Sequence, residues 1–253
     1  MHGSELQESA LGDHALLSDG VSGFLGFPVA ALDFYDDLEL DNTKSFWTTH
    51  QSTYETAVRA PMAALVAALE PEFGTAKIFR PYRDVRFAKD KTPYKEHQGA
   101  FVAVAPGAGC YVQIGAPGVR VSVGWYHADS ARLAAIRAAI DNERTGTDLE
   151  AKVAALEAFG WERGGDVLKT APRGYHATHP RIDLLRHRSL TLDRSYGFAP
   201  EVHTSDLLEW VRRDWRASRP LMEWIAAVQA PTTGRSTDGT PTGTRIDSNG
   251  ATW

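Results

Sequence analysis

The sequence predicts a single α+β domain, in which a largely antiparallel sheet packs with helices from both the N-terminal and the C-terminal parts of the chain. Apolar residues recur at helical spacing near both ends of the chain, whereas the middle shows the alternation typical of strands. Helices and strands segregated in this way favour α+β over a doubly wound parallel sheet. The chain has 253 residues, 43% of them hydrophobic, which suits one substantial domain.

Two helical segments are predicted before the sheet, over 28–39 and about 44–69. Pro28 fits the first helical turn, because the N–H that proline lacks would be unpaired there anyway. Asn42 interrupts the pattern and can cap the second segment. Pro61 lies inside that segment, and we expect it to kink or divide the helix, since proline removes one hydrogen bond and clashes with the preceding turn.

Strand-like patterns follow over 78–79, 99–105, 110–115 and 119–126. In the last of these, apolar residues from Val119 to Trp125 alternate with Arg120 and other polar or small residues, as in a half-buried strand. Pro117 and Gly118 suit the two central positions of a type II turn. We therefore expect 110–126 to form a hairpin within an antiparallel sheet.

Helical patterns return in the last part of the chain. Helices are predicted over 130–142, 148–159, 180–187 and 205–229, with a strand over 189–193. Thr147 and Glu150 have the spacing of a capping box, which would open the second of these helices. The tryptophans of the last helix are interpreted as core anchors: Trp210, Trp215 and Trp224.

The ends of the chain differ in composition from the body. We expect 1–21 to be a flexible N-terminus, 22–229 the single domain and 230–253 a disordered tail, because polar segments cannot bury enough surface to offset their ordering entropy. Cys110 is the only cysteine and lies in an apolar stretch, so we interpret it as a buried, inert thiol in a reducing compartment. Without a signal peptide or an apolar run of membrane length, we expect a cytoplasmic protein with no membrane partner.

The block 80–95, RPYRDVRFAKDKTPYK, is the most concentrated feature of the sequence. Six basic and two acidic residues give it a charge of +4 in a chain whose net charge is −5. A local cationic cluster against an acidic background indicates an anionic partner. Arginine matches phosphate or carboxylate with two donors and lysine adds point charge. The predicted ligand contacts in this block are Arg80, Arg83, Arg86, Lys91, Tyr94 and Lys95.

Two residues of this region are candidates for proton transfer. Asp84 lies among the arginines, and His97 follows directly after the block. Their types suit general acid–base catalysis, so they are the catalytic candidates if a reaction takes place. The sequence leaves open whether the protein is an enzyme.

A second basic group lies over 169–188, and its predicted ligand contacts are Lys169, Arg173, His179 and Arg188. If the chain brings this group to the first one, the two would form one electropositive pocket for a phosphate group or another anionic small molecule. His176 and His179 lack a third convergent ligand, so we predict no metal site. No cofactor motif is found, and we predict no cofactor.

Three hypotheses remain open at this stage. The first is the anion pocket, with or without catalysis. The second is a non-enzymatic module whose basic surface docks a nucleic acid or an acidic protein, although a sequence pI of about 6.0 argues against bulk non-specific nucleic-acid binding. The third is a purely structural network in which the basic side chains pair with internal carboxylates.

Several motifs together resemble one known family. They include Gly26-Phe27-Pro28, Trp47, His50, Tyr54, the whole of 80–95 with His97, Gly124-Trp125-Tyr126-His127, Pro172-Arg173-Gly174-Tyr175 and His179-Pro180. In these residues the chain resembles the bacterial and fungal family known as domain of unknown function 2461, over about 22–228. The resemblance implies one α+β domain in an intracellular protein. It implies no catalytic residue, cofactor or substrate.

Overall fold

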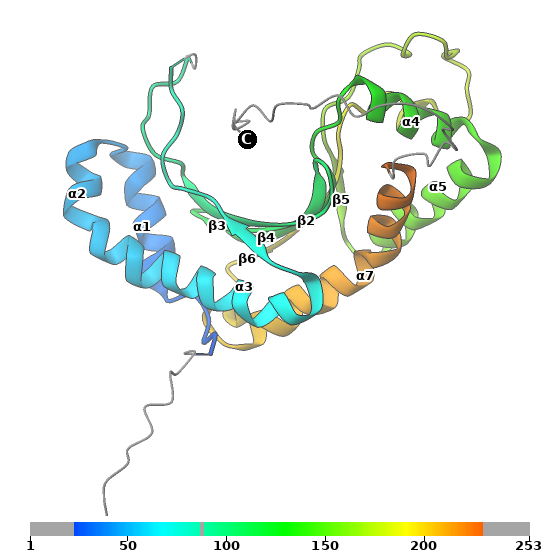
Figure 1. Ribbon diagram of the computed structural model, residues 1–253. Coiled ribbons are helices and arrows are strands. Elements are labelled where there is room, and N and C mark those ends of the chain that lie inside the picture. The colour runs from blue at the N-terminus through cyan, green and yellow to red at the C-terminus, as the bar shows by residue number, and fades with distance from the viewer. Residues whose placement is uncertain (1–22, 87–88, 230–253) are drawn as a thin grey trace, which may run out of the picture.

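The computed structural model describes residues 23–86 and 89–229, and the predicted flexible N-terminus and disordered tail lie outside these ranges. The predicted α+β fold is confirmed: one antiparallel sheet packs with helices from both parts of the chain (Figure 1). The six strands are β1 (Ala76–Ile78), β2 (His97–Ala105), β3 (Ala108–Gly115), β4 (Gly118–Trp125), β5 (Glu162–Gly164) and β6 (Leu190–Gly197).

The strands lie in the order β1-β2-β3-β4-β6-β5, and every neighbouring pair is antiparallel. The two edge strands, β1 and β5, have three residues each. The sheet is strongly curved, and the helices α1, α3 and α7 lie against its convex side (Figure 1). The concave side faces away from these helices.

The N-terminal helices are α1 (Val29–Leu40), α2 (Lys44–Thr53) and α3 (Ala60–Phe73), with a π-helical segment, Tyr54–Arg59, between α2 and α3. Pro61 stands at the start of α3, directly after the π-helical segment. The expected division of this helix is therefore the π-helical turn. Its hydrogen bonds join residues five apart instead of four, and it ends beside the proline, which has no N–H to donate.

The hairpin between β3 and β4 is confirmed, but its turn lies one residue earlier than predicted. Gly115 and Gly118 are register partners, so Ala116 and Pro117 occupy the centre of the turn. Gly118 has a φ of 92° and begins β4. A side chain there would meet the backbone of Gly197, because a Cβ would lie 1.9 Å from its carbonyl oxygen. Glycine is thus required at position 118, because any side chain there would clash with the neighbouring strand β6.

The predicted capping box was wrong. Helix α5 runs over Glu143–Ala158, and Asn142 caps it, since its Oδ1 accepts hydrogen bonds from the backbone N–H groups of Arg144 and Thr145. The amide side chain satisfies two donors that a helix leaves free at its start. Helix formation therefore begins one turn before the predicted box.

The other elements of the C-terminal half follow the predicted pattern. They are α4 (Ser130–Asp141), α6 (Ile182–Leu185) and α7 (Asp206–Gln229), with a 3₁₀ turn over Pro200–His203. The short strand β5 and the 3₁₀ turn were not predicted. None of the helices in the described part of the chain combines the length and the apolar character that crossing a membrane requires.

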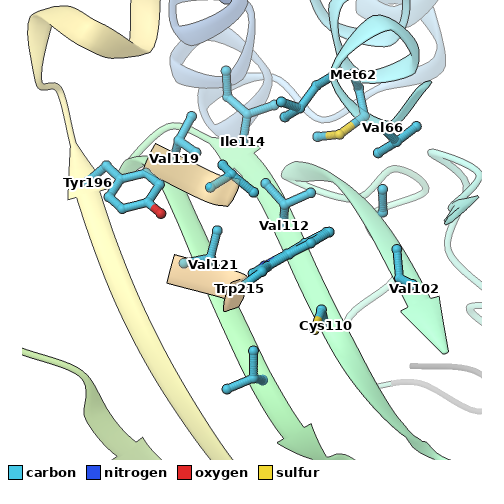
Figure 2. Close-up of a cluster of buried hydrophobic side chains, with 14 of the residues drawn as sticks. Met62, Val66, Val102, Cys110, Val112, Ile114, Val119, Val121, Tyr196 and Trp215 are labelled. Atoms are coloured by element: carbon cyan, nitrogen blue, oxygen red, sulfur yellow. The ribbon is translucent and has the colours of Figure 1, made fainter. Parts of the chain in front are cut away.

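The core lies between the convex face of the sheet and the helices. Side chains of β2, β3, β4 and β6 meet Met62 and Val66 of α3 and Trp215 of α7 (Figure 2). Trp215 and Trp224 are buried as predicted, and Trp210 is partly buried. Cys110 is buried in this layer, and burial raises the pKa of its thiol to about 12, as expected of an inert cysteine.

Candidate functional site

A cavity of about 1090 Å³ lies over the concave face of the sheet. The chain between β1 and β2 forms one wall of the cavity and rises away from the sheet in Figure 1. Strands β2, β3, β4 and β6 form the floor. The charged residues of its described lining are Lys77, Arg80, Asp84, Arg86, Lys95, Arg120 and Asp193.

The floor is polar because the polar residues of neighbouring strands lie on the same side of the sheet. Residues opposite one another on neighbouring strands point to the same side, so Gln113 of β3 and Arg120 of β4 share the concave face. Their apolar neighbours point into the core. Arg120 donates to the Gln113 Oε1 and to the Asp193 Oδ1, both at 3.2 Å, and Thr191 donates to the Asp193 Oδ2 at 2.8 Å. These contacts fix the polar part of the floor.

The wall is attached to the fold at its base. The Asn42 side chain accepts from the Tyr94 N–H at 3.1 Å and donates to the Tyr94 carbonyl at 3.0 Å. The Tyr94 ring stacks on Trp47, with ring centroids 4.2 Å apart and an interplanar angle of 5°. Tyr82 and Tyr94 form an isolated antiparallel bridge. Tyr94, a predicted ligand contact, is thus buried as an anchor of the wall and is outside the cavity lining.

Lys77 of β1 and two cations of the wall, Arg80 and Lys95, form no ion pair among the described residues, although the charge of Arg80 also acts on Asp84. Lys77 and Lys95 both approach the ring of Phe79, with Nζ 5.6 and 5.3 Å from its centroid. Arg80 follows Phe79 directly. Burial lowers the pKa of Lys95, and repulsion from Arg80 and Lys77 lowers it further. The three positive charges are therefore close enough to repel one another.

Other charged residues of the block pair within it. Arg83 donates to the Asp90 Oδ2 at 2.5 Å, and Arg86 binds both carboxylate oxygens of Asp84, at 2.9 and 2.5 Å. Lys91 donates to the Val85 carbonyl at 2.9 Å. Arg83 and Lys91, both predicted ligand contacts, are outside the described cavity lining. Such pairs are expected under the hypothesis that the basic block forms an internal ion-pair network.

The two catalytic candidates both line the cavity, but they differ in their charge and in their hydrogen bonds. The guanidinium of Arg86 lowers the pKa of Asp84 to about 2, so this carboxylate stays ionised and its oxygens stay occupied. Burial lowers the pKa of His97 to about 4, and the charges of Lys95 and Arg120 add to the effect. His97 is therefore neutral at pH 7, and the described residues give its ring no hydrogen bond. Of the two, His97 has the freer proton-accepting atoms.

The second basic group lies at the other edge of the sheet. Residues 80–95 connect β1 to β2, whereas 169–188 belong to the connection between β5 and β6, and β3 and β4 separate the two edges. Figure 1 shows the two connections at opposite ends of the sheet. None of the predicted contacts Lys169, Arg173, His179 and Arg188 is in the described lining of the cavity.

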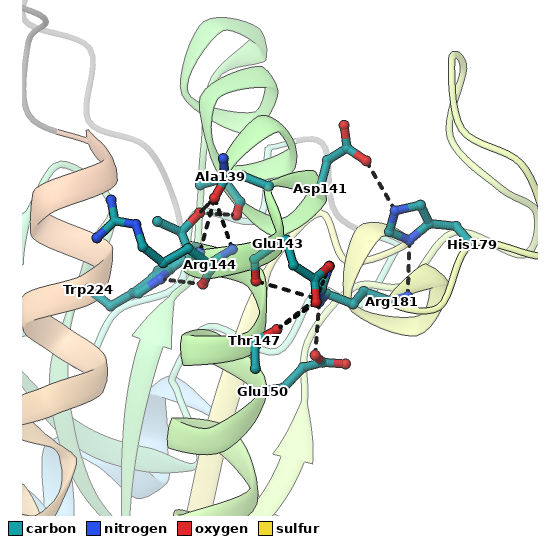
Figure 3. Close-up of polar contacts among 11 residues, drawn as sticks. Ala139, Asp141, Glu143, Arg144, Thr147, Glu150, His179, Arg181 and Trp224 are labelled. Carbon is teal, nitrogen blue, oxygen red and sulfur yellow. Dashed lines mark hydrogen bonds and ion pairs between the residues drawn. The ribbon is translucent and has the colours of Figure 1, made fainter.

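Part of the second group has a structural role. Arg181 is buried, and its guanidinium donates to the Glu150 Oε2 and the Glu143 Oε2, each at 2.8 Å, and to the Thr147 hydroxyl at 2.7 Å (Figure 3). The residues of the wrongly predicted capping box therefore hold Arg181. The His179 Nδ1 accepts from the Arg181 N–H at 3.0 Å, so its Nε2 donates to a carboxylate oxygen of Asp141.

The remaining predicted contacts of this group lie at the surface. Arg188 pairs with Asp166 at 2.5 Å, while Lys169 and Arg173 are exposed. Among the described residues, no group of three or more His, Cys, Asp and Glu side chains is placed to hold a metal ion.

Sequence reasoning missed most of the floor. The missed residues are Lys77, Phe79, Phe101, Tyr111, Gln113, Arg120, Ser122, Tyr126, Thr191 and Asp193. A signal was present in β4, where Arg120, Ser122 and Tyr126 alternate with apolar residues. That pattern predicts a half-buried strand, but by itself it does not show that the polar side of the strand faces a cavity.

No curated protein and no solved structure matches the chain. A family model described as a conserved hypothetical protein, DUF2461, matches residues 30–224. The match includes α1, the whole sheet, both basic segments and most of α7. Since it covers well over half of the sequence, it confirms the resemblance found in the motifs, and the chain belongs to the DUF2461 family.

Proposed function

We propose that the concave cavity binds a ligand that bears a phosphate or a carboxylate group. The observation that supports this is the cluster of Lys77, Arg80 and Lys95, three cations of the cavity lining that form no ion pair among the described residues. Like charges held together destabilise one another, and a bound anion relieves that repulsion. The proposed ligand site includes residues of 80–97, as the sequence analysis expects, but it does not include 169–188.

The shape of the site also supports a bound small molecule. The cavity is bounded by a curved floor and by a wall that Asn42 and Tyr94 anchor, so the backbone that carries Arg80 and Lys95 is fixed before a ligand arrives. Arg120 stands on the floor at the same cavity, fixed by Gln113 and Asp193. A concave site that is ordered before binding lowers the conformational entropy that the protein loses when a ligand binds.

A purely structural network accounts for only part of the block. It explains Arg83, Asp84, Arg86 and Asp90, which pair with one another. It gives no ion pair to Lys77, Arg80 and Lys95. A non-enzymatic module for nucleic acid or an acidic protein remains the second proposal, and it predicts an affinity that falls steeply as salt concentration rises.

Isothermal titration calorimetry with inorganic phosphate and with citrate tests the binding proposal. We expect the double variant Lys77→Met/Lys95→Met to weaken binding about 100-fold or more, because each of the two charge-assisted contacts contributes roughly 1.5–3 kcal/mol. The matched control is Lys169→Met, an exposed lysine outside the cavity, which leaves the affinity unchanged. Equal binding by the double variant, or no binding of either anion to the unchanged protein, would overturn the proposal.

A further inference from the structure

Two aromatic side chains of the floor lean over glycines on the neighbouring strand. Tyr111 of β3 lies over Gly99, where a Cβ would come within 2.2 Å of its hydroxyl and 2.6 Å of its ring carbons. Phe101 of β2 lies over Gly109, where a Cβ would come within 2.7 Å of its ring. Phe101 and Tyr111 are register partners and both line the cavity.

The glycines determine how these rings face the cavity. Both rings reach over the position of a missing Cβ and line the cavity, and both also lie near the ring of Tyr126, whose centroid is 5.5 Å from that of Phe101 and 6.4 Å from that of Tyr111. Any other residue at Gly99 or Gly109 would push the ring away from this position. The floor therefore presents two aromatic surfaces, and such surfaces bind planar groups by stacking.

A hydrogen-bond donor lies beside the rings. The Gln113 Oε1 accepts from the Tyr111 hydroxyl at 3.0 Å and from the Arg120 guanidinium at 3.2 Å. Both contacts go to the oxygen, so they fix the amide orientation and leave the Gln113 Nε2 as a donor without a partner among the described residues. His97 belongs to the same lining and offers an unbonded ring nitrogen. Both groups can bind the polar edge of a planar ligand.

The anion cluster and the aromatic floor are neighbours. Lys77 is the register partner of Phe101, and the Phe79 ring between Lys77 and Lys95 lies 6.2 Å from the Tyr111 ring. A ligand with an anion at one end and a planar ring at the other would meet both features in one cavity.

We propose that the cavity takes a phosphate ester of a planar heteroaromatic group, of the nucleoside monophosphate class. Its phosphate binds the cluster of Lys77, Arg80 and Lys95, and its base stacks over Phe101 and Tyr111. The Gln113 amide donates to an acceptor on the edge of the base. This inference rests on the proposed binding of an anion in the same cavity.

The charges favour a single nucleotide over a nucleic-acid strand. A groove for single strands carries cations along the path of the backbone. Here the unpaired cations gather around Phe79, and the other two cations of the described lining, Arg86 and Arg120, pair with carboxylates. One cluster of this kind suits one phosphate group.

The test compares three ligands by isothermal titration calorimetry: adenosine monophosphate, ribose 5-phosphate and inorganic phosphate. Stacking of one base on aromatic side chains corresponds to an affinity gain of about 5- to 150-fold. We expect adenosine monophosphate to bind tighter than ribose 5-phosphate by a factor in this range. Tyr111→Leu is expected to remove most of that advantage and to leave the affinity for ribose 5-phosphate unchanged.

Two further variants separate stacking from loss of structure. Gly99→Ala keeps both aromatic rings but displaces Tyr111, so it is expected to reduce the advantage of the nucleotide in the same way. Phe198→Leu is the matched control, since Phe198 is an exposed aromatic residue outside the lining. Circular dichroism shows whether each variant folds, and the comparison of ligands on the unchanged protein decides the question if a variant does not.

The outcomes distinguish this inference from the binding proposal on which it rests. If ribose 5-phosphate binds as tightly as adenosine monophosphate, the base adds nothing and the inference is wrong, while the anion site stands. If none of the three ligands binds, the inference is wrong, and if citrate does not bind either, the proposed function itself fails. If a short single-stranded oligonucleotide binds far more tightly than the mononucleotide, with a steep salt dependence, the ligand is a nucleic acid and the mononucleotide is excluded.

Discussion

His97 should make the stability of the protein depend on pH in a calculable way. The unfolded chain binds a proton at His97 near pH 6.5, whereas burial and nearby cations lower the pKa in the folded protein to about 4. Between these values the unfolded state holds more protons than the folded state. The contribution of His97 is therefore full above about pH 6.5 and is lost as the pH falls toward 4.

The size of the effect follows from the two pKa values. The difference of about 2.5 pH units corresponds to at most about 3 kcal/mol when the titration is complete. Between pH 7 and pH 5 the linkage relation gives a loss of about 2 kcal/mol in the free energy of unfolding. Carboxylates with lowered pKa, such as Asp84, titrate mainly at lower pH and contribute little in this window.

Urea unfolding at pH 7 and pH 5 measures the loss. His97→Gln removes the titrating group, so the variant should lose about 2 kcal/mol less than the unchanged protein over this interval. Burial also lowers the pKa of His187, but that contribution is the same in both proteins and cancels. His176→Gln, at an exposed position, is the control. Equal pH dependence in the unchanged protein and in His97→Gln would refute the reasoning.

Three further predictions concern the core and the wall of the cavity. Trp215→Ala should destabilise the fold by about 3–5 kcal/mol, because the side chain is almost fully buried; a change below 1 kcal/mol in urea unfolding would contradict the packing of α7 on the sheet. Tyr54→Phe removes the hydroxyl that donates to the buried Gln98 Oε1 at 2.5 Å, and the unsatisfied acceptor should cost about 1–3 kcal/mol, measured in the same way. Asn42→Ala removes both side-chain bonds to the Tyr94 backbone, so amide hydrogen exchange at Tyr94 should accelerate while core amides stay protected; an unchanged rate would mean that other contacts hold the wall.

The strands could be predicted because each carries a local pattern. Alternation from Val119 to Trp125 identifies the strand and the face that packs in the core, but the strand is more than half-buried, since Ser122 and Gly124 of the other face are buried too and Arg120 is exposed. The turn and the start of α5 were misplaced because two local signals competed in each case. Asn142 outcompetes the box at Thr147, since it reaches two free N–H groups at the first turn of a longer helix.

The site was harder to predict because it depends on strand order. Nothing local to 80–95 or to 169–188 shows that β3 and β4 separate them. The charge count identified two cations of the cluster, Arg80 and Lys95, but it missed the third, Lys77. Arg83 and Lys91 have internal partners, whereas Lys77 precedes the basic block and could be recognised only once β1 was paired with β2.

The short edge strands have a consequence for the behaviour of the protein in solution. An open sheet face with exposed edges is a template on which other chains can add strands and aggregate. Here β1 and β5 offer only three residues each, and Glu162 and Arg163 place charges on β5. A sheet of six strands can therefore leave its concave face uncovered for a ligand without offering long edges to neighbouring molecules.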